Sequence, residues 1–221
     1  MLQLLSLRKR FDATPLFTDV SLTLAPGEFV ALIGESGVGK STLLNCIAGL
    51  DDADAGQVLL RGQSLADLND DARARLRRQH LGFVFQAFHV LPHLSVAENV
   101  GLPLMLLGRL DRQDMAQRVA QVLDSLGLGD LGTRMPAQLS GGELQRVAIA
   151  RAVVHAPALI LADEPTGNLD PRTAARVLAA LQQQVRTTGA ACLLVTHSAA
   201  AAATADRVLR LTPEGVIAET P

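Results

Sequence analysis

The run Gly34-Glu35-Ser36-Gly37-Val38-Gly39-Lys40-Ser41-Thr42 has residue types and a spacing that can bind phosphate. It fits the pattern G-x-x-x-x-G-K-[ST]. The glycines allow backbone N–H groups to turn towards an anion without clashes from Cβ atoms. In such a loop, Lys40 reaches the terminal phosphates of a nucleotide and the Ser41 hydroxyl binds Mg²⁺.

The amino-acid composition supports a specific role for the lysine of this loop. The chain contains 18 arginines but only two lysines, Lys9 and Lys40. In a sequence so strongly biased towards arginine, a lysine inside the loop indicates that a compact ammonium group is needed there rather than a planar guanidinium.

Two carboxylates follow a second apolar run. Asp163 and Glu164 come directly after Leu159-Ile160-Leu161-Ala162. Ligands of parallel sheets bind beyond the carboxyl ends of the strands, so Asp163 is placed to hold Mg²⁺ and Glu164 to accept a proton from an attacking water. Taken alone, the pair fits an ordinary polar strand end about as well, and the phosphate loop upstream favours the functional interpretation.

A Ser-Gly-Gly turn opens a later helix. Ser140, Gly141 and Gly142 would offer a hydroxyl and free N–H groups to a second anion. Ser140 and Glu143 also fit a capping box, which is an ordinary way to begin a helix. The spacing leaves both interpretations open.

The surrounding pattern predicts a parallel α/β core with a helical insert. The continuous apolar run Phe29–Ile33 is typical of a central parallel strand, and the alternation of Val20, Leu22 and Leu24 is typical of a half-buried strand. Further strands are expected at 58–60, 81–85, 158–162, 191–195, 207–211 and 216–217, and helices at 70–78, 111–126, 142–154 and 171–186. The insert extends from about 95 to 155.

Composition excludes several classes of protein. A length of 221 residues indicates one domain, or one domain with a subdomain, and a net charge of −2 argues against a nucleic-acid binder held by charge. No stretch approaches the roughly 20 apolar residues that span a bilayer, and the N-terminus does not fit a secretory signal. We therefore expect a soluble chain whose membrane role, if any, comes through a partner. Cys46 and Cys192 are expected to be buried thiols in a reducing compartment.

One basic cluster needs a separate interpretation. The helix expected at 70–78 carries Arg73, Arg75, Arg77 and Arg78. Charge runs of this kind usually form a solvated face, and we expect that here rather than a binding patch.

Together these motifs resemble the ATP-binding-cassette (ABC) ATPases, in order and spacing and over nearly the whole chain. The resemblance rests on 34–42, Gln86, 139–143, 159–164, 168–170 and His197. Within the family, the segments 85–100 and 162–170 are similar to the branch that includes the lipoprotein-release, macrolide-export and cell-division ATPases.

The resemblance implies a fold. It is that of an α/β P-loop NTPase: a RecA-like parallel-sheet core, an N-terminal antiparallel β subdomain and an inserted α-helical subdomain. It further implies that about 1–86 and 158–221 form the catalytic core, and that about 87–157 form the helical subdomain with the signature motif.

The resemblance also implies cofactors and roles. ATP and Mg²⁺ are the implied ligands, with Ser41, Gln86 and Asp163 at the metal. Glu164 is similar to the catalytic base, Gln86 to the hinge glutamine, His197 to the γ-phosphate switch residue and Lys40 to the phosphate-binding lysine. Phe11 aligns with the aromatic residue that stacks on adenine, although the alternative that Phe11 is a core residue stays open.

Two kinds of partner are implied. The first is a second copy of the chain in a head-to-tail, ATP-induced homodimer, in which Ser140–Gly142 cover the γ-phosphate of the other subunit and the loop ending at Asp170 crosses the interface. The second is a transmembrane permease, which would place the chain on the inner face of the cell membrane. The permease is expected to dock near 86–100, on the apolar surface of Phe88, Val90 and Leu91.

Two points remain open at this stage. A regulatory or mechanotransmission module of a membrane complex, similar to the cell-division ATPase, is the alternative to a transport ATPase. A non-transport member of the superfamily is less consistent with one cassette, two cysteines and no long heptad pattern. The chain departs from the family at Ser198, where Asp is common; Ser can still cap the helix that follows.

Overall fold

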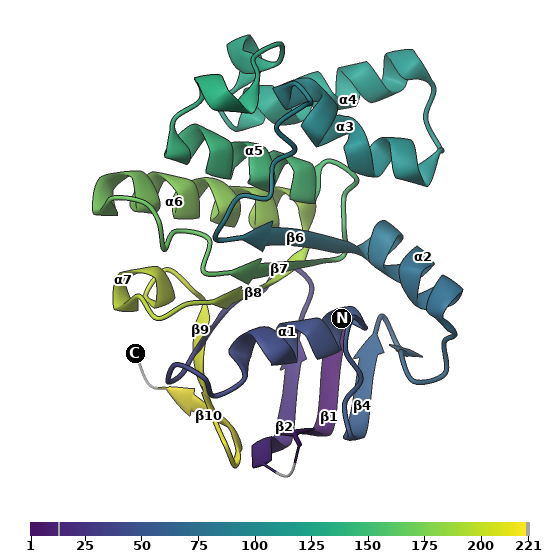
Figure 1. The fold of residues 1–221 in the computed structure, drawn as a ribbon, viewed down its shortest axis with the longest axis vertical. Helices are drawn as coiled ribbons and strands as arrows, with labels where there is room; N and C mark the ends of the chain where they lie inside the picture. Colours follow the sequence, from purple (N-terminus) through teal and green to yellow (C-terminus); the bar gives the residue numbers. More distant parts are fainter. Residues whose placement is uncertain (13, 220–221) are drawn as a thin grey trace.

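The computed structural model describes residues 1–12 and 14–219. Its strands form two sheets (Figure 1). The first sheet is antiparallel, with the order β2 (Thr14–Leu24), β1 (Leu2–Phe11), β4 (Ala55–Leu60) and β5 (Gln63–Ser64). The second has the order β10 (Gly215–Glu219), β9 (Arg207–Thr212), β3 (Phe29–Ile33), β8 (Ala191–Val195), β7 (Leu159–Asp163) and β6 (Leu81–Phe85).

The second sheet is parallel from β9 to β6, as the apolar runs predict, and β10 adds an antiparallel edge. Its central strands are buried on both faces. Neighbouring residues of β8 belong to different core clusters, Leu193 to one and Leu194 to the other. An uninterrupted apolar run is therefore required at these strands, because neither face meets water.

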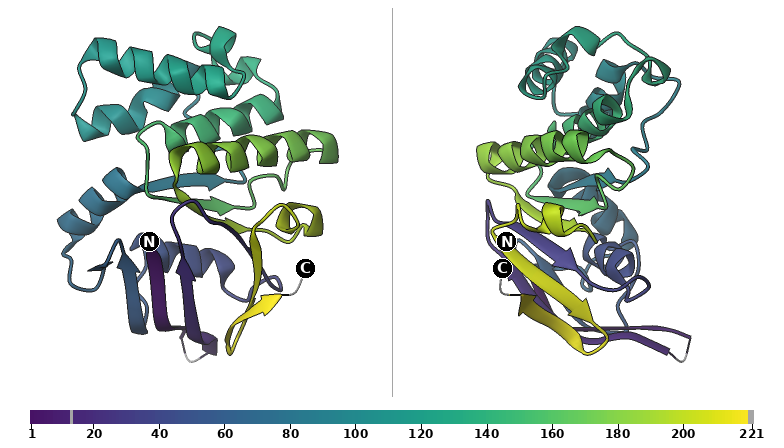
Figure 2. Two further views of the ribbon diagram at one scale, coloured as in Figure 1. Left: turned by 180° about the vertical axis from the view of Figure 1, so that it is seen from behind. Right: turned by 90° about the vertical axis from the view of Figure 1, so that its left-hand side faces the viewer.

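The helices lie on both sides of this sheet. They are α1 (Lys40–Ala48), α2 (Asp70–His80), α3 (Val96–Leu107), α4 (Arg112–Ser125), α5 (Gly141–Val153), α6 (Pro171–Thr188) and α7 (Ala199–Ala202). Helices α3, α4 and α5 gather at one end of the molecule, the antiparallel strands lie at the other, and α6 lies beneath α5 (Figure 2). Short 3-10 turns at Gly129–Leu131 and Pro136–Gln138 interrupt the segment that the sequence pattern presents as helical.

The helical end shares its core with the sheet. Val100 of α3, Val147 of α5 and Leu181 of α6 belong to the same buried cluster as Ile160 of β7. The other cluster joins α1, the antiparallel strands and the opposite face of the second sheet. Among the described helices, none is long and apolar enough to cross a membrane.

Strand β1 is not predicted by the sequence pattern. Leu2 and Leu4 point into the core and Leu5 outward, but the next buried residue is Leu7, and the register with β2 shifts between Leu4 and Leu7. Such an irregularity changes the phase of the apolar alternation within one strand. The alternation is therefore too short on either side to identify the strand.

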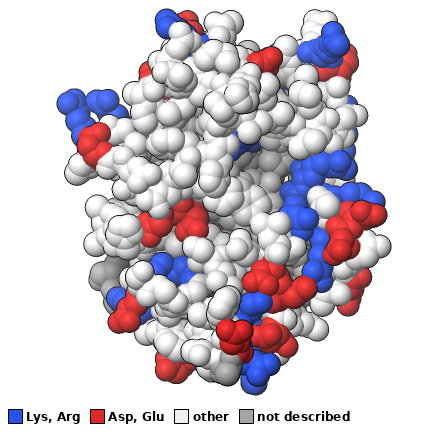
Figure 3. All heavy atoms as spheres, viewed as in Figure 1, with Lys and Arg blue, Asp and Glu red and all other residues white. Residues whose placement is uncertain are grey.

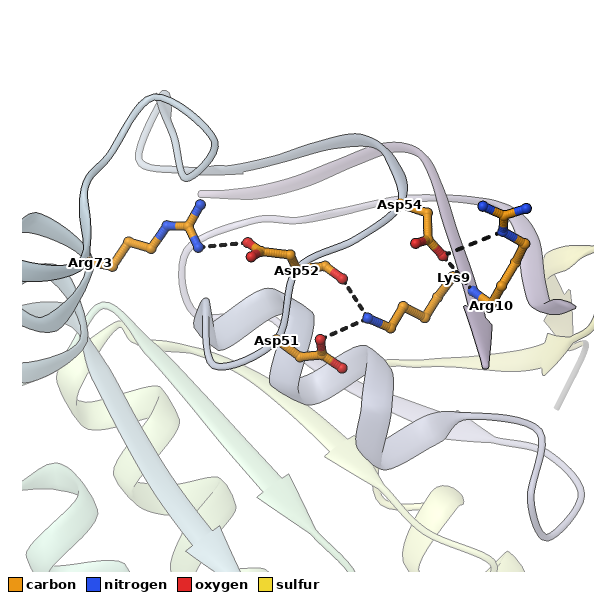
Figure 4. Close-up of polar contacts among 6 residues, drawn as sticks. All are labelled: Lys9, Arg10, Asp51, Asp52, Asp54 and Arg73. Carbon is orange, nitrogen blue, oxygen red and sulfur yellow. Dashed lines mark hydrogen bonds and ion pairs between the residues drawn. The ribbon is translucent and has the colours of Figure 1, made fainter. Parts of the chain in front are cut away.

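Lys9 fastens β1 to the segment that follows α1 (Figure 4). Its Nζ lies 2.7 Å from Asp51 Oδ1 and donates to the carbonyl oxygen of Asp52 at 2.6 Å. The hydrogen bond to Asp51 raises the pKa of Lys9. The Asp52 carboxylate in turn accepts from Arg73 of α2 at 2.6 Å. Lys9 therefore has a structural role at the junction of β1, the loop after α1 and helix α2.

Candidate nucleotide-binding site

The predicted site residues lie at one edge of the second sheet. In the order β3, β8, β7 and β6, each strand is followed by a candidate residue: Gly34 after β3, His197 after β8, Glu164 after β7 and Gln86 after β6. Because these strands are parallel neighbours, their carboxyl ends lie side by side. The sheet thus assembles groups that are far apart in the sequence, as expected for this class of sheet.

The phosphate loop has a backbone that requires glycine. Gly37 and Gly39 have φ values of 83° and 100°, which L side chains rarely adopt. A Cβ atom on Gly34 would lie 2.8 Å from the carbonyl oxygen of Leu211. Lys40 Nζ donates to the carbonyl oxygens of Gly34 and Glu35, both at 2.8 Å, so its ammonium group lies within the curve of the loop.

Glu164 is held in a strained backbone next to His197. Its φ is 47°, uncommon for a residue other than glycine, and its N–H donates to the carbonyl oxygen of Val195 at 2.9 Å. Its Oε1 lies 2.7 Å from His197 Nδ1. The Glu164 side chain is 17% exposed and that of His197 is 71% exposed, so the pair has one sheltered and one open member.

The loop from Glu164 to Asp170 also meets Gln86. The side-chain amides of Gln86 and Asn168 are hydrogen-bonded, with 3.0 Å between Gln86 Nε2 and Asn168 Oδ1. The loop then ends at Asp170, whose carboxylate accepts from the N–H groups of Arg172 and Thr173 and begins α6. A hydrogen bond from the Thr173 side chain, together with these N–H groups, lowers the pKa of Asp170.

Ser140 forms the capping box that was one of its two interpretations. Its hydroxyl donates to Glu143 Oε2 at 2.6 Å and accepts from the Glu143 N–H at 3.4 Å. The N–H groups of the first two helical residues, Gly141 and Gly142, have no partner within the helix. A Cβ on Gly142 would lie 2.4 Å from Thr173, so this turn packs tightly against the start of α6.

Phe11 is 72% exposed at the end of β1. The core interpretation of Phe11 is therefore wrong, and its ring is free to meet a planar ligand. Ser198 caps the next helix, as expected, by accepting from the Ala201 N–H at 3.3 Å.

The donor set at the sheet edge fits Mg²⁺ in kind. Within residues 1–12 and 14–219, no group of three or more His, Cys, Asp and Glu side chains could hold a metal. The three residues expected to hold Mg²⁺, Ser41, Gln86 and Asp163, offer a hydroxyl, an amide oxygen and a carboxylate instead. These are hard oxygen donors of the type that Mg²⁺ prefers, and substrate phosphates usually complete such a site.

A hollow of about 810 Å³ lies between α2, β6, α3 and α5, and its lining extends to Phe85, directly before Gln86. Figure 3 shows Lys and Arg side chains on one rim of the hollow in this face of the molecule. Its apolar wall includes Phe83, Leu102 and Leu106, and the charged groups that line it are Asp71, Arg75, Arg77, Arg78 and Arg151. Spacing alone does not reveal it, because its walls come from four separate segments.

The expectation of a fully solvated basic face on α2 is wrong for half of the cluster. Arg73 donates to the Leu65 carbonyl oxygen and Arg77 to the Gly49 carbonyl oxygen, at 3.1 and 2.7 Å. Both guanidinium groups therefore hydrogen-bond to main-chain carbonyl groups of other segments, and the Leu65 carbonyl oxygen also accepts from the Leu68 N–H at 3.2 Å. The two other arginines, at 75 and 78, are exposed.

Residues 17–167, more than half of the chain, match the family described as ABC transporter. The chain belongs to the ABC transporter family. As an ABC cassette it is an ATP-binding, ATP-hydrolysing protein, and the expected fold class is confirmed.

The cassette is similar to named transport ATPases. It is 49% identical to the lipoprotein-releasing system ATP-binding protein LolD of Maricaulis maris, over 88% of this chain and 85% of that protein. It is 43% identical to a macrolide export ATP-binding/permease protein MacB of Yersinia pestis, over 100% of this chain and 34% of that longer protein. These relatives favour a transport ATPase over a regulatory module.

Solved structures support the same conclusion. The dimeric structure of the bacterial ABC transporter cassette MJ0796 has a TM-score of 0.88 and 36% identity, and the match covers 100% of this chain and 98% of that one. A dimeric post-hydrolysis state of MJ0796 bound to ADP and Pi matches equally well. This neighbour therefore dimerises as a cassette.

Proposed function

We propose that this cassette hydrolyses ATP to drive a membrane permease in a system of the lipoprotein-release or macrolide-export type, working at the inner face of the cell membrane. The observation that carries the proposal is the meeting of four candidate groups at one sheet edge, where Glu164 lies 2.7 Å from His197. About 1–86 and 158–221 act as the catalytic core, and about 87–157 as the helical subdomain.

In this proposal the phosphate loop and Lys40 hold the phosphates, and the ring of Phe11 stacks on adenine. Ser41, Gln86 and Asp163 hold Mg²⁺, which supplies positive charge to the developing negative charge of phosphoryl transfer. Glu164 orients the attacking water and accepts its proton, and His197 fixes the Glu164 carboxylate and reaches towards the γ-phosphate.

The site is completed by a second copy of the chain. Ser140, Gly141 and Gly142 belong to a turn that packs against Thr173 and Leu169 rather than against the phosphate loop of the same chain. Their free N–H groups at a helix start suit the γ-phosphate held by the other subunit. One subunit alone is therefore expected to hydrolyse ATP poorly.

Glu164→Gln tests this function. Light scattering with Mg²⁺-ATP should give a stable dimer for the variant, because it binds ATP but cannot use it, and turnover only for the wild type. Glu214→Gln, at an exposed turn, is the matched control and should behave as wild type. A Glu164→Gln variant that turns over ATP as fast as wild type contradicts the assignment of the base.

The permease is proposed to dock in the hollow between α2 and α3. Four arginines and one aspartate line it, so its formal charge is positive although the whole chain is at −2. Burial lowers the pKa of Arg151, which also donates to the carbonyl oxygens of Phe88 and His89. An amphipathic segment with apolar anchors and carboxylates complements this surface.

This docking surface differs from the one expected from the sequence, which was formed by Phe88, Val90 and Leu91. Phe88 and Val90 are partly buried, and Val90 packs against the core. Leu91 is 45% exposed and remains available. In the hollow, Leu102 and Leu106 contribute to the apolar wall, and Leu106 is 63% exposed.

Charge reversal tests the docking surface. Arg75→Glu should reduce the amount of permease that co-purifies with the cassette from solubilised membranes, and leave ATP binding unchanged. Arg112→Glu, exposed on α4, is the control. Equal loss of permease and of ATP binding in Arg75→Glu would mean that the variant is misfolded or that the hollow is not the docking surface.

A further inference from the structure

Gln86 and Asn168 form a reciprocal contact between two loops of the site. Gln86 follows β6 directly, whereas Asn168 lies in the loop between β7 and α6. Gln86 Nε2 donates to Asn168 Oδ1 at 3.0 Å, and Asn168 Nδ2 donates to the main-chain carbonyl oxygen of Gln86 at 3.4 Å. Asn168 therefore contacts both the side chain and the backbone of the same residue.

This contact determines which way the Gln86 amide faces. The Nδ2 group of Asn168 can only donate, and a carbonyl oxygen can only accept, so Nδ2 must lie on the backbone of Gln86. Asn168 Oδ1 then faces the Gln86 side chain, and Gln86 must present its Nε2 to it. Gln86 Oε1, the atom of that side chain able to bind a cation, has no hydrogen-bond partner among the described residues.

The loop that carries Asn168 is held in place by its own main-chain hydrogen bonds. Its turns are closed by hydrogen bonds from Gly167 N–H to the Glu164 carbonyl oxygen and from Leu169 N–H to the Thr166 carbonyl oxygen, both at 3.1 Å. Gly167 lies directly against Gln86, because a Cβ there would be 2.8 Å from Gln86 Nε2. The Gln86 side chain is thus laid on the loop as well as bonded to it.

We propose that Asn168 is a positioning residue for Gln86: it fixes the amide so that Oε1 stays free for the metal that accompanies ATP. The inference rests on the proposed function, in which Gln86 binds that metal. Since the same loop begins at Glu164, Asn168 also ties the position of Gln86 to the backbone of the proposed base. Without Asn168, the exposed amide rotates freely and presents Nε2 or Oε1 equally.

Two substitutions at position 168 separate the effect of the hydrogen-bond acceptor Oδ1 from the effect of the side-chain volume. Asn168→Ala removes the acceptor, whereas Asn168→Asp keeps an oxygen for Gln86 Nε2 and loses only the longer contact, at 3.4 Å, from Nδ2 to the Gln86 carbonyl oxygen. In the nucleotide-free ¹⁵N-labelled protein, the side-chain amide resonance of Gln86 is identified by its loss in Gln86→Ala. Asn168→Ala should move this resonance to the position of a free amide, and Asn168→Asp should not.

A second measurement uses the metal itself. The Mg²⁺ concentration for half-maximal ATP hydrolysis should rise about two- to tenfold in Asn168→Ala, the range expected for one lost hydrogen bond. It should stay within about twofold of wild type in Asn168→Asp. In a Gln86→Ala background, Asn168→Ala should add nothing. Gln183→Ala, at an exposed position of α6, is the control.

Several outcomes overturn the inference. They are an unmoved Gln86 resonance in Asn168→Ala, an Asn168→Asp variant that behaves like Asn168→Ala, and an Asn168→Ala effect that persists without Gln86. Failure of the proposed function looks different, because Gln86→Ala would then leave the Mg²⁺ dependence of ATP hydrolysis unchanged, whereas the resonance experiment uses no nucleotide.

Discussion

Gly82→Ala and Gly101→Ala are the same chemical change, and the structure predicts opposite effects on stability. Gly82 lies in β6 against α5, where a Cβ would be 2.3 Å from the carbonyl oxygen of Ala152 and 3.2 Å from Pro157 Cγ. Gly101 lies in α3, where a Cβ would meet Val119 Cγ2 at 3.6 Å, an ordinary contact. Neither glycine has a positive φ, so the outcome depends on space alone.

The magnitudes follow from that space. At position 82 the obstacle is a main-chain atom that must retreat by about 1 Å, which places the cost in the upper part of the usual 1–3 kcal/mol for overpacking. The lower chain entropy of alanine returns about 0.4–1 kcal/mol, leaving a loss of about 1–2 kcal/mol. At position 101 the helix gains about 1 kcal/mol, since alanine replaces glycine without a clash.

Thermal unfolding measures both effects. For a chain of this size, the melting temperature should fall by about 2–8 °C in Gly82→Ala and rise by about 2–4 °C in Gly101→Ala. A Gly82→Ala protein that melts at or above the wild-type temperature would refute the packing of β6 against α5. A fall in the melting temperature of Gly101→Ala as large as that of Gly82→Ala would show that the space around a glycine does not predict the sign of the stability change.

Three further predictions concern single groups. Burial lowers the pKa of His155, so the folded chain favours the neutral imidazole. The contribution of His155 to the free energy of unfolding is therefore fully present above the unfolded pKa near 6.5 and is lost as the pH falls. The drop in melting temperature from pH 7.5 to 5.5 should be smaller in His155→Gln than in the wild type. Burial raises the pKa of Cys46 to about 11 and raises that of Cys192 as well. Neither thiol should therefore react with iodoacetamide at pH 8 until denaturant is added. Labelling of the folded protein would contradict the burial of these cysteines. Gly167→Ala displaces the amide of Gln86 and should lower kcat about tenfold or more with little change in melting temperature. Full activity in this variant would show that the contact between Gly167 and Gln86 is irrelevant to turnover.

The parts of the fold with local signals could be predicted from the sequence. The strand at Phe29–Ile33 and the capped start of α3 at Ser95 were both recognisable, because burial on two faces and a capping box each leave a short-range pattern. Strand β1 left no such pattern, since its bulge changes the apolar phase between Leu4 and Leu7. Long-range pairing with β2 and β4 forms the strand despite its irregular sequence.

The site shows the same division. The phosphate loop and the pair Asp163 and Glu164 could be found from spacing, because each is built by consecutive residues. The amide contact between Gln86 and Asn168 could not, since it joins positions 82 residues apart through side chains with no distinctive type. The hollow lined by Arg75 was likewise hidden, because charge in a helix does not tell which neighbours leave room beside it.

Helix α1 has a function beyond presenting the phosphate loop. It begins at Lys40 and ends at Ala48, and the carbonyl oxygen of the next residue, Gly49, accepts from Arg77 of α2. A cation thus sits at the negative end of a helix whose positive end faces the phosphate loop. Nine residues rising about 1.5 Å each give α1 a length of about 14 Å between the end that contacts α2 and the phosphate loop. Helix α1 therefore connects α2 to the phosphate loop by a route that does not include Gln86.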